Sequence, residues 1–279
     1  MSQALRADQA LVARGLAASR TAAQRLIDAA RVYYAGTETA VKKASEVVAS
    51  DEDLEVRAAA DGLPGEDRYV SRGGLKLAGA LAQTRLDVTG RVALDVGLST
   101  GGFADCLLQA GGGRGGGVDV GHGQLHRRLA REPRLVSLEG INARHLSRET
   151  LDARLAQQAA EGGAQGEPAS TMAAVPEAGF DLIVGDVSFI SLTLVLPAVA
   201  PLLGATGDLL MLVKPQFEVG REHIGRGGLV RDAAQYAQVE TKIRAACETL
   251  GLTVAAWLDS PIAGGDGNRE FFVHATRAA

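Results

Sequence analysis

The sequence predicts an α/β fold in which a doubly wound, mostly parallel sheet follows a small α+β domain. From residue 71 onward, short apolar runs alternate with longer helix-like segments, which is the pattern of successive βαβ units. The last two apolar runs are joined instead by a loop that contains Pro and Gly. Because no helix separates these two runs, we expect the last strand to run antiparallel to the rest of the sheet.

Strands and helices can be placed along the larger domain, residues 71–279. The expected strands are Val92–Val96, Gly117–Val120, Leu135–Leu138, Phe180–Val184, Leu209–Val213, Thr253–Trp257 and Glu270–His274. The main expected helices are Lys76–Gln83, Phe103–Ala110, Ile190–Leu203 and Ala233–Leu250. Residues 156–178 have low complexity, so we expect them to form a surface insertion.

The first sixty residues predict two short helices followed by short strands. Leu11, Val12 and Leu16 share one face of the first helix. The second can be capped by Ser19, or by Thr21 with Gln24 as a capping box. Strands are expected at Val32–Tyr34, Val47–Val48 and Leu54–Val56, and an acidic stretch with Gly and Pro follows them. The expected domains are therefore residues 1–60 and 71–279, with a linker at 61–70.

The charge of the chain is unevenly distributed. Residues 1–45 hold seven Lys or Arg and three Asp or Glu, whereas the whole chain carries a formal net charge of −4. The content of hydrophobic residues, 46%, is that of an ordinary globular protein. A basic N-terminal segment on an acidic body predicts that a polyanion binds at the N-terminus.

Neither a metal site nor a membrane span is predicted. Cys106 and Cys247 form no metal or disulfide pattern, which favours a reducing, cytoplasmic environment, and no signal peptide is recognisable. His122 and His126 have the spacing of a zinc motif but lack its glutamate. The uncharged stretch 187–207 is long enough to span a membrane, but its two prolines favour a buried helix between strands.

The loop D-V-G-L-S-T-G-G-F at residues 95–103 predicts a nucleoside-cofactor site. Its glycines let the backbone approach a ligand, yet it lacks the G-x-G-x-x-G pattern of dinucleotide sites. Asp95 at the strand end suits a ligand with cationic groups, and Asp119 can accept from both ribose hydroxyls. This combination indicates S-adenosylmethionine, whereas the loop alone could equally be a glycine-rich turn without a ligand.

The methyl acceptor is expected to be a hydroxyl group. Enzymes that methylate exocyclic amino groups commonly carry D/N-P-P-Y/F after the fourth strand, where this chain has D-V-S-F at 186–189. Neither cysteine lies in a loop, as carbon-5 methylation of pyrimidines would need. A hydroxyl needs orientation and a proton acceptor, and the candidate side chains are Lys76, Asp186, Lys214 and Glu270. Each of these side chains could also be a solvated charge without a catalytic role. The aromatic content of the chain is only 4%, so no platform on which an RNA base could stack is obvious.

Several ordered motifs resemble those of one methyltransferase family. They include Y-V-S-R-G-G-L-K-L (69–77), V-D-V-G-H-G-Q-L (118–125), K-P-Q-F-E-V-G (214–220) and S-P-I-A-G-G-D-G-N-R-E-F (260–271). Together with the two stretches above, they resemble the TlyA family of rRNA 2′-O-methyltransferases, often labelled haemolysin A, with an FtsJ-like catalytic domain. The first sixty residues resemble the α-L RNA-binding domain of a ribosomal protein and of pseudouridine synthases.

The resemblance implies a class I (Rossmann-like) methyltransferase fold and S-adenosylmethionine-dependent 2′-O-methylation of cytidine in ribosomal RNA. The implied catalytic tetrad is Lys76, Asp186, Lys214 and Glu270, with Lys214 orienting or deprotonating the ribose hydroxyl. The implied cofactor contacts are Asp95, Gly97, Ser99, Thr100, Gly101, Gly102, Phe103, Asp119, Val120, Glu139, Asn142 and Asp186. The expected RNA contacts are Arg6, Arg14, Ser19, Arg20, Arg25 and Arg31, and the expected partner is ribosomal RNA or a ribosomal subunit.

Some positions depart from the family pattern. Leu98 replaces a small residue in the cofactor loop, so a tighter approach of the ligand is expected. Glycines at 111–117 are expected to weaken the second strand by roughly 0.5–1 kcal/mol each. Ile141 stands where the family tends to have a hydroxyl residue. Two other functions stay open from the sequence, a membrane-active haemolysin and an RNA-binding factor without catalysis, and so does the oligomeric state.

Overall fold

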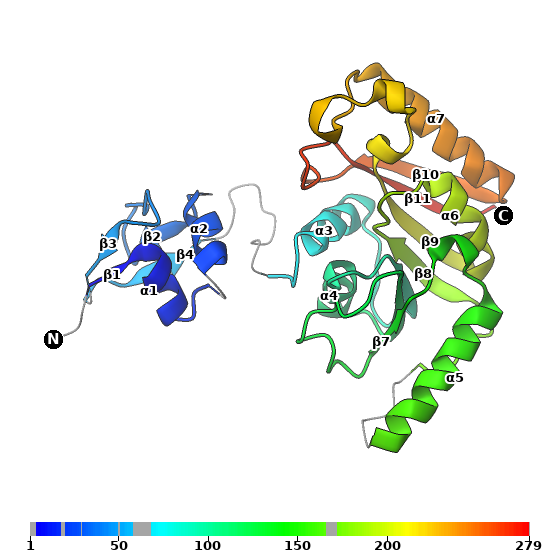
Figure 1. Ribbon diagram of the computed structural model, residues 1–279, viewed down its shortest axis with the longest axis horizontal. Coiled ribbons are helices and arrows are strands. Elements are labelled where there is room, and N and C mark those ends of the chain that lie inside the picture. Colours follow the sequence, from blue (N-terminus) through cyan, green and yellow to red (C-terminus); the bar gives the residue numbers. More distant parts are fainter. Residues whose placement is uncertain are drawn as a thin grey trace. The chain divides into compact units, whose positions relative to one another are not determined.

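The computed structural model of the protein describes residues 4–17, 20–28, 30–49, 51–57, 68–165 and 172–278 (Figure 1). The chain divides into two compact units, Met1–Tyr69 and Val70–Ala279. Each unit has a hydrophobic core of its own. The expected domains, 1–60 and 71–279, lie one in each unit, whereas most of the expected linker lies outside the described residues.

The first unit is built from two short helices and two small antiparallel strand pairs. In chain order its elements are β1 (Leu5–Arg6), α1 (Ala7–Ala13), α2 (Arg20–Asp28), β2 (Val32–Tyr34), β3 (Val47–Val48) and β4 (Leu54–Val56). β1 pairs with β3 and β2 pairs with β4. Leu11, Leu26, Ile27 and Val32 are buried together in the core. The two predicted helices and three predicted strands are confirmed, whereas the two-residue strand β1 was not predicted.

The second unit contains a seven-stranded sheet in the order β10-β11-β9-β8-β5-β6-β7. Its strands are β5 (Ala93–Val96), β6 (Gly115–Asp119), β7 (Leu135–Glu139), β8 (Phe180–Gly185), β9 (Leu203–Val213), β10 (Leu252–Asp259) and β11 (Phe271–Arg277). The five strands from β9 to β7 are parallel, and β11 runs antiparallel to both β9 and β10. The fold class, including the antiparallel last strand, is therefore as predicted.

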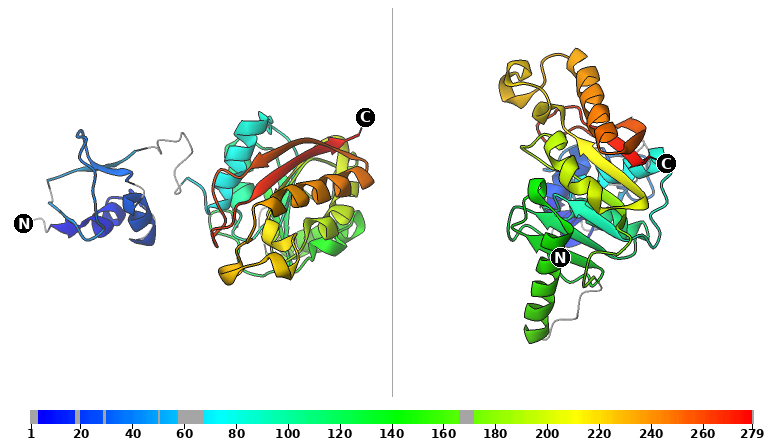
Figure 2. Two further views of the ribbon diagram at one scale, coloured as in Figure 1. Left: turned by 90° about the horizontal axis from the view of Figure 1, so that it is seen from above. Right: turned by 90° about the vertical axis from the view of Figure 1, so that its right-hand side faces the viewer.

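Helices cover both faces of this sheet. α3 (Gly73–Thr84) and α4 (Gly102–Gln109) lie on one face, whereas α6 (Leu192–Val199) and α7 (Ala234–Thr249) lie on the other (Figures 1 and 2). The apolar strands β8 and β9 occupy the middle of the sheet and are almost completely buried. Burial on both faces explains why these strands contain the uninterrupted apolar runs Leu182–Val184 and Leu209–Val213.

The prediction of a surface insertion at 156–178 is wrong in part. Helix α5 (Arg148–Gln165) extends into this stretch, and its first half is anchored by the buried side chains of Leu151 and Leu155. Met172 and Val175 are also buried in the main core. The Ala- and Gln-rich composition that suggested an irregular loop also favours a helix, once its first two turns are fixed by packing.

The expected helix 190–203 is shorter than predicted. α6 ends at Val199, a 3₁₀ turn follows at Ala200–Leu202, and β9 begins at Leu203. Pro201 contributes to the early end, because it has no N–H with which to continue the hydrogen bonds of the α-helix. Among the described residues, no helix is both long and apolar enough to cross a membrane.

Candidate active site

The four side chains of the expected tetrad meet at one edge of the sheet. Asp186 follows β8, Lys214 follows β9, and Lys76 lies in the first turn of α3. Glu270 directly precedes β11, whose residue Phe271 pairs with Val213. Because β11 is antiparallel to β9, the start of β11 lies beside the end of β9, and Glu270 reaches the edge where the parallel strands end. Loops at this edge commonly form ligand sites in open α/β sheets.

Lys76 and Glu270 form a buried ion pair. Lys76 Nζ lies 2.6 Å from Glu270 Oε2, and the two side chains are only 9% and 2% exposed. Burial raises the pKa of the Glu270 carboxyl, and the Lys76 charge opposes that rise. The contact is close but lacks the angles of a hydrogen bond, so attraction between charges dominates it.

Lys214 and Asp186 form a second ion pair that is more open. Lys214 Nζ lies 2.6 Å from Asp186 Oδ1, and the side chains are 12% and 23% exposed. Lys214 also donates a hydrogen bond to Ser188 Oγ over 2.7 Å. Both Asp186 and Lys214 line a cleft at the sheet edge, so this pair is accessible to a bound molecule.

The cleft has two parts of about 480 and 150 Å³. Four residues line both parts: Gly97, Ser99, Asp186 and Ser188. The larger part extends to Asp119 and Asn142, and the smaller part reaches Lys214. A volume of this size accommodates a nucleoside derivative, and the shared residues would place its reactive end near the open ion pair.

Most of the expected cofactor residues line this cleft, and three do not. The lining residues are Gly97, Ser99, Thr100, Gly102, Phe103, Asp119, Val120, Asn142 and Asp186. Gly101 instead takes a left-handed conformation where α4 begins, and Glu139 accepts a hydrogen bond from the Gly123 N–H over 2.9 Å. The third, Asp95, is buried beneath the loop.

The backbone of the loop after β5 needs glycine at position 97. Gly97 has φ +90°, and a Cβ there would lie 2.7 Å from the Asp186 carbonyl oxygen. Ser99 is also left-handed and donates its N–H to Asp119 Oδ2 over 2.8 Å. The loop is therefore held directly against the ends of β6 and β8, with the Asp119 carboxylate fixed at the cleft wall.

Asp95 supports the loop from below and lines neither part of the cleft. Its Oδ2 accepts the Ala104 N–H over 3.0 Å, at the start of α4, and its Oδ1 has no hydrogen-bond partner among the described residues. Burial, with the nearby charges of Asp186 and Asp119, raises the pKa of the Asp95 carboxyl to about 8. We conclude that this side chain holds loop and helix together.

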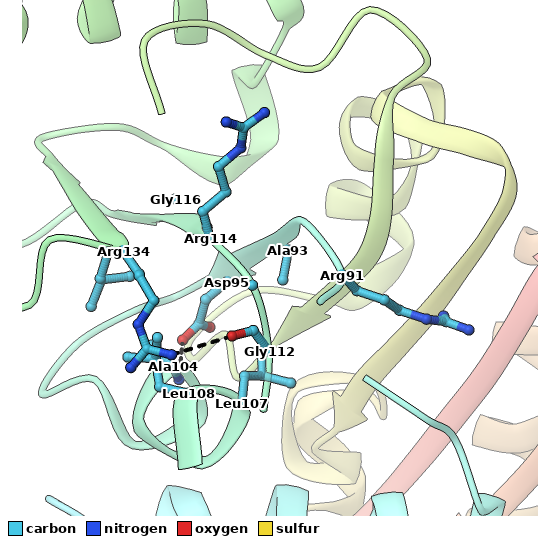
Figure 3. Close-up of a pocket in the computed structure, with 13 residues that line it drawn as sticks. Arg91, Ala93, Asp95, Ala104, Leu107, Leu108, Gly112, Arg114, Gly116 and Arg134 are labelled. Atoms are coloured by element: carbon cyan, nitrogen blue, oxygen red, sulfur yellow. Dashed lines mark hydrogen bonds between the residues drawn. The ribbon is translucent and has the colours of Figure 1, made fainter. Parts of the chain in front are cut away.

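A separate small cavity lies against Asp95 (Figure 3). Its volume is about 30 Å³, and it is bordered by Ala104, Arg134 and the glycines of the 112–116 segment. Arg134 points across it and donates to the Gly112 carbonyl over 3.5 Å. The cavity shares no lining residue with the cleft and has room for water only, so it is not a cofactor site.

Leu98 and Gly117, two departures from the family pattern, pack against each other. A Cβ at Gly117 would lie 2.6 Å from Leu98 Cδ1 and 2.7 Å from Cδ2. Leu98 is 3% exposed, and its N–H donates to the Val118 carbonyl over 3.0 Å. The leucine side chain occupies the space that a side chain on β6 would fill, and the cofactor loop is seated on that strand.

Sequence reasoning missed an exposed aromatic residue beside the open ion pair. Phe189 is 91% exposed, has a left-handed φ of 63°, and lies with its ring centroid 5.3 Å from that of Phe217. A bulky residue rarely adopts such a backbone conformation. The signal was present in D-V-S-F, which places an aromatic residue where N-P-P-Y motifs have one.

The expected RNA-binding arginines are tied to their own unit. Arg6 Nε and Arg20 Nη2 lie 3.1 and 2.7 Å from the two oxygens of Asp8, whose pKa they lower to about 2. Arg14 donates to the Glu52 carbonyl and Arg31 to the Arg57 carbonyl. Arg6 and Arg20 are still 45% and 60% exposed, so both guanidinium groups remain accessible. Ser19 and the Arg25 side chain lie outside the described part of the chain.

Other chemistries find no support in the described residues. No group of three His, Cys, Asp or Glu among them could hold a metal ion. Cys106 and Cys247 are both buried, within α4 and α7, and burial raises the pKa of the Cys247 thiol to about 11. A buried thiol cannot reach a substrate, so neither cysteine is placed to attack a pyrimidine ring, as carbon-5 methylation would need.

The family model described as FtsJ-like methyltransferase matches residues 69–277. The chain belongs to this family. The match covers the second unit, Val70–Ala279, except for its last two residues, and it includes all four tetrad residues and the cleft. The second unit is hereafter called the FtsJ-like domain.

Relatives extend the similarity beyond the FtsJ-like domain. A Bacillus subtilis protein named "Putative rRNA methyltransferase YqxC" is 40% identical, with 96% of this chain and 84% of the relative covered. The 16S/23S rRNA (cytidine-2′-O)-methyltransferase TlyA of Mycobacterium tuberculosis is 38% identical, covering 98% and 90%. The resemblance to the TlyA family is thereby confirmed.

A solved structure supports the fold of the whole chain. The "Putative hemolysin from Streptococcus thermophilus" is 34% identical, has a TM-score of 0.66, and covers 99% of this chain and 89% of that chain. The similarity therefore includes the N-terminal unit as well as the FtsJ-like domain.

Proposed function

We propose that this protein transfers a methyl group from S-adenosylmethionine to the ribose 2′-hydroxyl of a cytidine in ribosomal RNA. The observation that carries the proposal is the open ion pair, in which Lys214 lies between Asp186 and Ser188 at the cleft. An amine in this position can orient an alcohol and accept its proton. The name of the tuberculosis relative supports cytidine in ribosomal RNA as the target.

The cleft fits S-adenosylmethionine. When bound, this cofactor supplies an electrophilic methyl group on a positively charged sulfur. The Asp119 carboxylate lines the larger part of the cleft and has lone pairs free for ribose hydroxyls. Gly97 leaves space for close approach where a Cβ would clash. Asp186 lines both parts of the cleft and favours a cationic group there.

Proton transfer is assigned to Lys214. In its neutral form the Lys214 amine accepts the proton of the 2′-hydroxyl, so that the oxygen attacks the methyl carbon in line with the departing sulfur. The resulting ammonium is stabilised by the Asp186 carboxylate 2.6 Å away. The buried pair of Lys76 and Glu270 holds α3 against the start of β11 and keeps the surrounding charges balanced.

The exposed ring of Phe189 offers an RNA base a stacking surface near the Lys214 amine. Phe189 is exposed and lines the larger part of the cleft, and its backbone holds the ring out of the core. A base that is turned out of the RNA can stack on an aromatic ring, which would bring its ribose toward the catalytic side chains.

The N-terminal unit is proposed to bind ribosomal RNA through its basic residues. Arg6 and Arg20 are held by Asp8 but leave much of their surface exposed. Arginines fixed in this way lose little side-chain entropy when they contact phosphate. A ribosomal substrate also implies a cytoplasmic location for this protein.

The proposal is tested by incubating the purified full chain with labelled S-adenosylmethionine and three substrates: small subunits, large subunits and protein-free ribosomal RNA. Methylated positions are then mapped by mass spectrometry of RNA fragments. We expect label on the 2′-oxygen of a cytidine, and a loss of about 10²–10⁴-fold in rate for Lys214→Ala.

Three outcomes would contradict the proposal. Label on a base or on ribosomal protein would show a different acceptor. Normal transfer by Lys214→Ala, with its folding verified by circular dichroism, would show that this lysine does not accept the proton. Lysis of erythrocytes by the wild-type protein and by Lys214→Ala alike, without any transfer of label, would favour the haemolysin function instead.

A further inference from the structure

Ser188 is a polar side chain in the cleft to which the sequence assigned no role. It is exposed and lines both parts of the cleft. Its Oγ accepts the hydrogen bond from Lys214 Nζ at 2.7 Å. Its own O–H is not engaged with any described residue, so accepting this bond costs the serine no other interaction.

Asp186 and Ser188 act on the lysine in different ways. Asp186 Oδ1 lies 2.6 Å from Lys214 Nζ but outside the angular range of a hydrogen bond. The carboxylate therefore attracts the N–H groups of the amine, but it restrains the rotation of the amine less than a directional hydrogen bond does. Ser188 makes the directional bond to this amine among the residues that the structure describes. The rotation about the Cε–Nζ bond of Lys214 thus depends on Ser188.

The direction of the amine matters because a proton acceptor must point its lone pair at the proton. A neutral lysine amine has two N–H groups and one lone pair around the Cε–Nζ axis. If one N–H is fixed on Ser188, the Asp186 carboxylate attracts the second N–H and repels the lone pair. The lone pair is left in the remaining position, away from both partners, where an acceptor hydroxyl can approach.

We infer that Ser188 is a positioning residue that aims the Lys214 amine at the methyl acceptor. The inference rests on the proposed function for its catalytic consequence, but the orientation of the amine can be measured without any substrate. Because the serine hydroxyl is uncharged, its removal changes the direction of the amine and leaves the charges of the site in place.

Ser191, three residues further on, provides a matched control. Its Oγ accepts the Thr193 N–H at the start of α6 and donates to Glu218 over 2.6 Å. A hydroxyl is lost in Ser191→Ala as in Ser188→Ala, but the bonds lost are those of a helix cap. This control variant is expected to melt at a lower temperature and to keep the orientation of Lys214.

The kinetic experiment compares Ser188→Ala and Ser188→Thr with the wild-type protein on its ribosomal substrate. For Ser188→Ala we expect kcat to fall about 10- to 100-fold, a part of what a well-placed general base contributes. The KM for S-adenosylmethionine and the pH of half-maximal rate should stay near their wild-type values, because no charge is lost. Ser188→Thr keeps the hydroxyl and should retain most of the rate.

The second experiment observes the lysine directly by NMR, with lysine labelled at the ε-carbon. The chain has lysines only at positions 42, 43, 76, 214 and 242, so few signals need assignment. An oriented Lys214 gives two distinct Hε shifts in the wild type, in Ser188→Thr and in Ser191→Ala. In Ser188→Ala the two shifts should move toward each other, because a side chain that has lost this hydrogen bond samples more rotamers about its Cδ–Cε bond.

Several results would overturn the inference: unchanged Hε shifts in Ser188→Ala, an unchanged kcat, an effect confined to KM, or equal losses in the alanine and threonine variants. A wild-type protein that shows the expected NMR pattern but transfers no methyl group would contradict the proposed function. In that case the positioning of the amine by Ser188 would still stand.

Discussion

The two ion pairs of the site differ mainly in their access to solvent. The pair of Lys76 and Glu270 is buried, with side chains 9% and 2% exposed, and neither residue lines the cleft. The pair of Lys214 and Asp186 lines the cleft and is 12% and 23% exposed. The same two types of charge are thus used once inside the protein and once at a surface that a substrate can reach.

Because of this difference in exposure, we expect the buried pair to contribute mainly to stability and the open pair mainly to the reaction. A buried charge depends on its partner, because an unpaired ion in the interior is strongly destabilised. A partly exposed charge keeps some hydration, so its loss affects the reaction more than the fold. Asp95 and Leu98 belong with the buried pair, since both support the loop from positions that are 3% exposed. Ser188 and Phe189 belong with the open pair.

The largest expected effect on stability comes from breaking the buried pair. Lys76→Ala leaves Glu270 buried without a counter-charge and should lower the free energy of unfolding by about 3–5 kcal/mol. Lys214→Ala leaves Asp186 with some contact to solvent, so it should lower the free energy of unfolding by less than Lys76→Ala does, while abolishing most activity. Urea unfolding of both variants, followed by circular dichroism, measures the contrast directly.

A double variant sharpens this test. Replacing both members of the buried pair, Lys76→Met with Glu270→Leu, removes the uncompensated charge and should recover much of the lost stability without restoring activity. Equal destabilisation by Lys76→Ala and Lys214→Ala would show that burial does not distinguish the two pairs.

An intermediate effect is expected where Leu98 packs on Gly117. Gly117→Ala places a Cβ within 2.6 Å of Leu98 Cδ1, so the leucine or the loop must move. Such overpacking typically costs about 1–3 kcal/mol. Because the loop borders the cleft, the affinity for S-adenosylmethionine, measured by calorimetry, should fall with the free energy of unfolding.

The double variant Gly117→Ala with Leu98→Ala tests whether the two positions are coupled. Removing the leucine provides room for the new methyl group, so the double variant should be more stable than the sum of the single effects implies, by about 1 kcal/mol or more. Gly265→Ala serves as the control, because a Cβ there meets no atom within 4 Å and should change little. Additive effects would show that the two departures from the family pattern are independent.

The strands and the edge that carries the site could be predicted because they depend on local patterns. Continuous apolar runs marked β8 and β9, and each was followed by a charged residue, Asp186 or Lys214. The order of the strands in the sheet then brings these two residues together. Glu270 was a candidate because it opens the last expected strand, but that Lys76 is its partner could not be predicted from the residues alone, since the place of Glu270 depends on the pairing of β11 with β9.

Features that depend on packing between distant segments were not predictable. The loop motif suggested that Asp95 faces the cofactor, but its carboxylate turns toward the Ala104 N–H beneath the loop. Leu98 was expected to tighten the approach of the ligand and the glycine-rich stretch to weaken the second strand, as separate effects, yet Leu98 fills the space above Gly117. The exposure of Phe189 follows from its left-handed backbone, which the residue type does not favour.

The last prediction concerns Asp95 and the pH dependence of the free energy of unfolding, whose change is the smallest of these effects when it is counted per pH unit. Its carboxyl ionises near pH 4 in the unfolded chain but has a pKa of about 8 in the folded protein. Between these values the folded state holds a proton that the unfolded state has lost. The free energy of unfolding should therefore fall as pH rises, by at most about 1.4 kcal/mol per pH unit, and the fall should stop above pH 8.

Asp95→Asn isolates this contribution, because the amide can still accept the Ala104 N–H but does not ionise. The variant and the wild type have all other titrating groups in common. From about pH 5 to pH 8 the stability of the wild type should therefore fall steadily relative to that of the variant. Urea unfolding at several pH values measures it. A constant difference would show that Asp95 is ionised throughout, and that its carboxylate has a counter-charge or access to water despite its position beneath the loop.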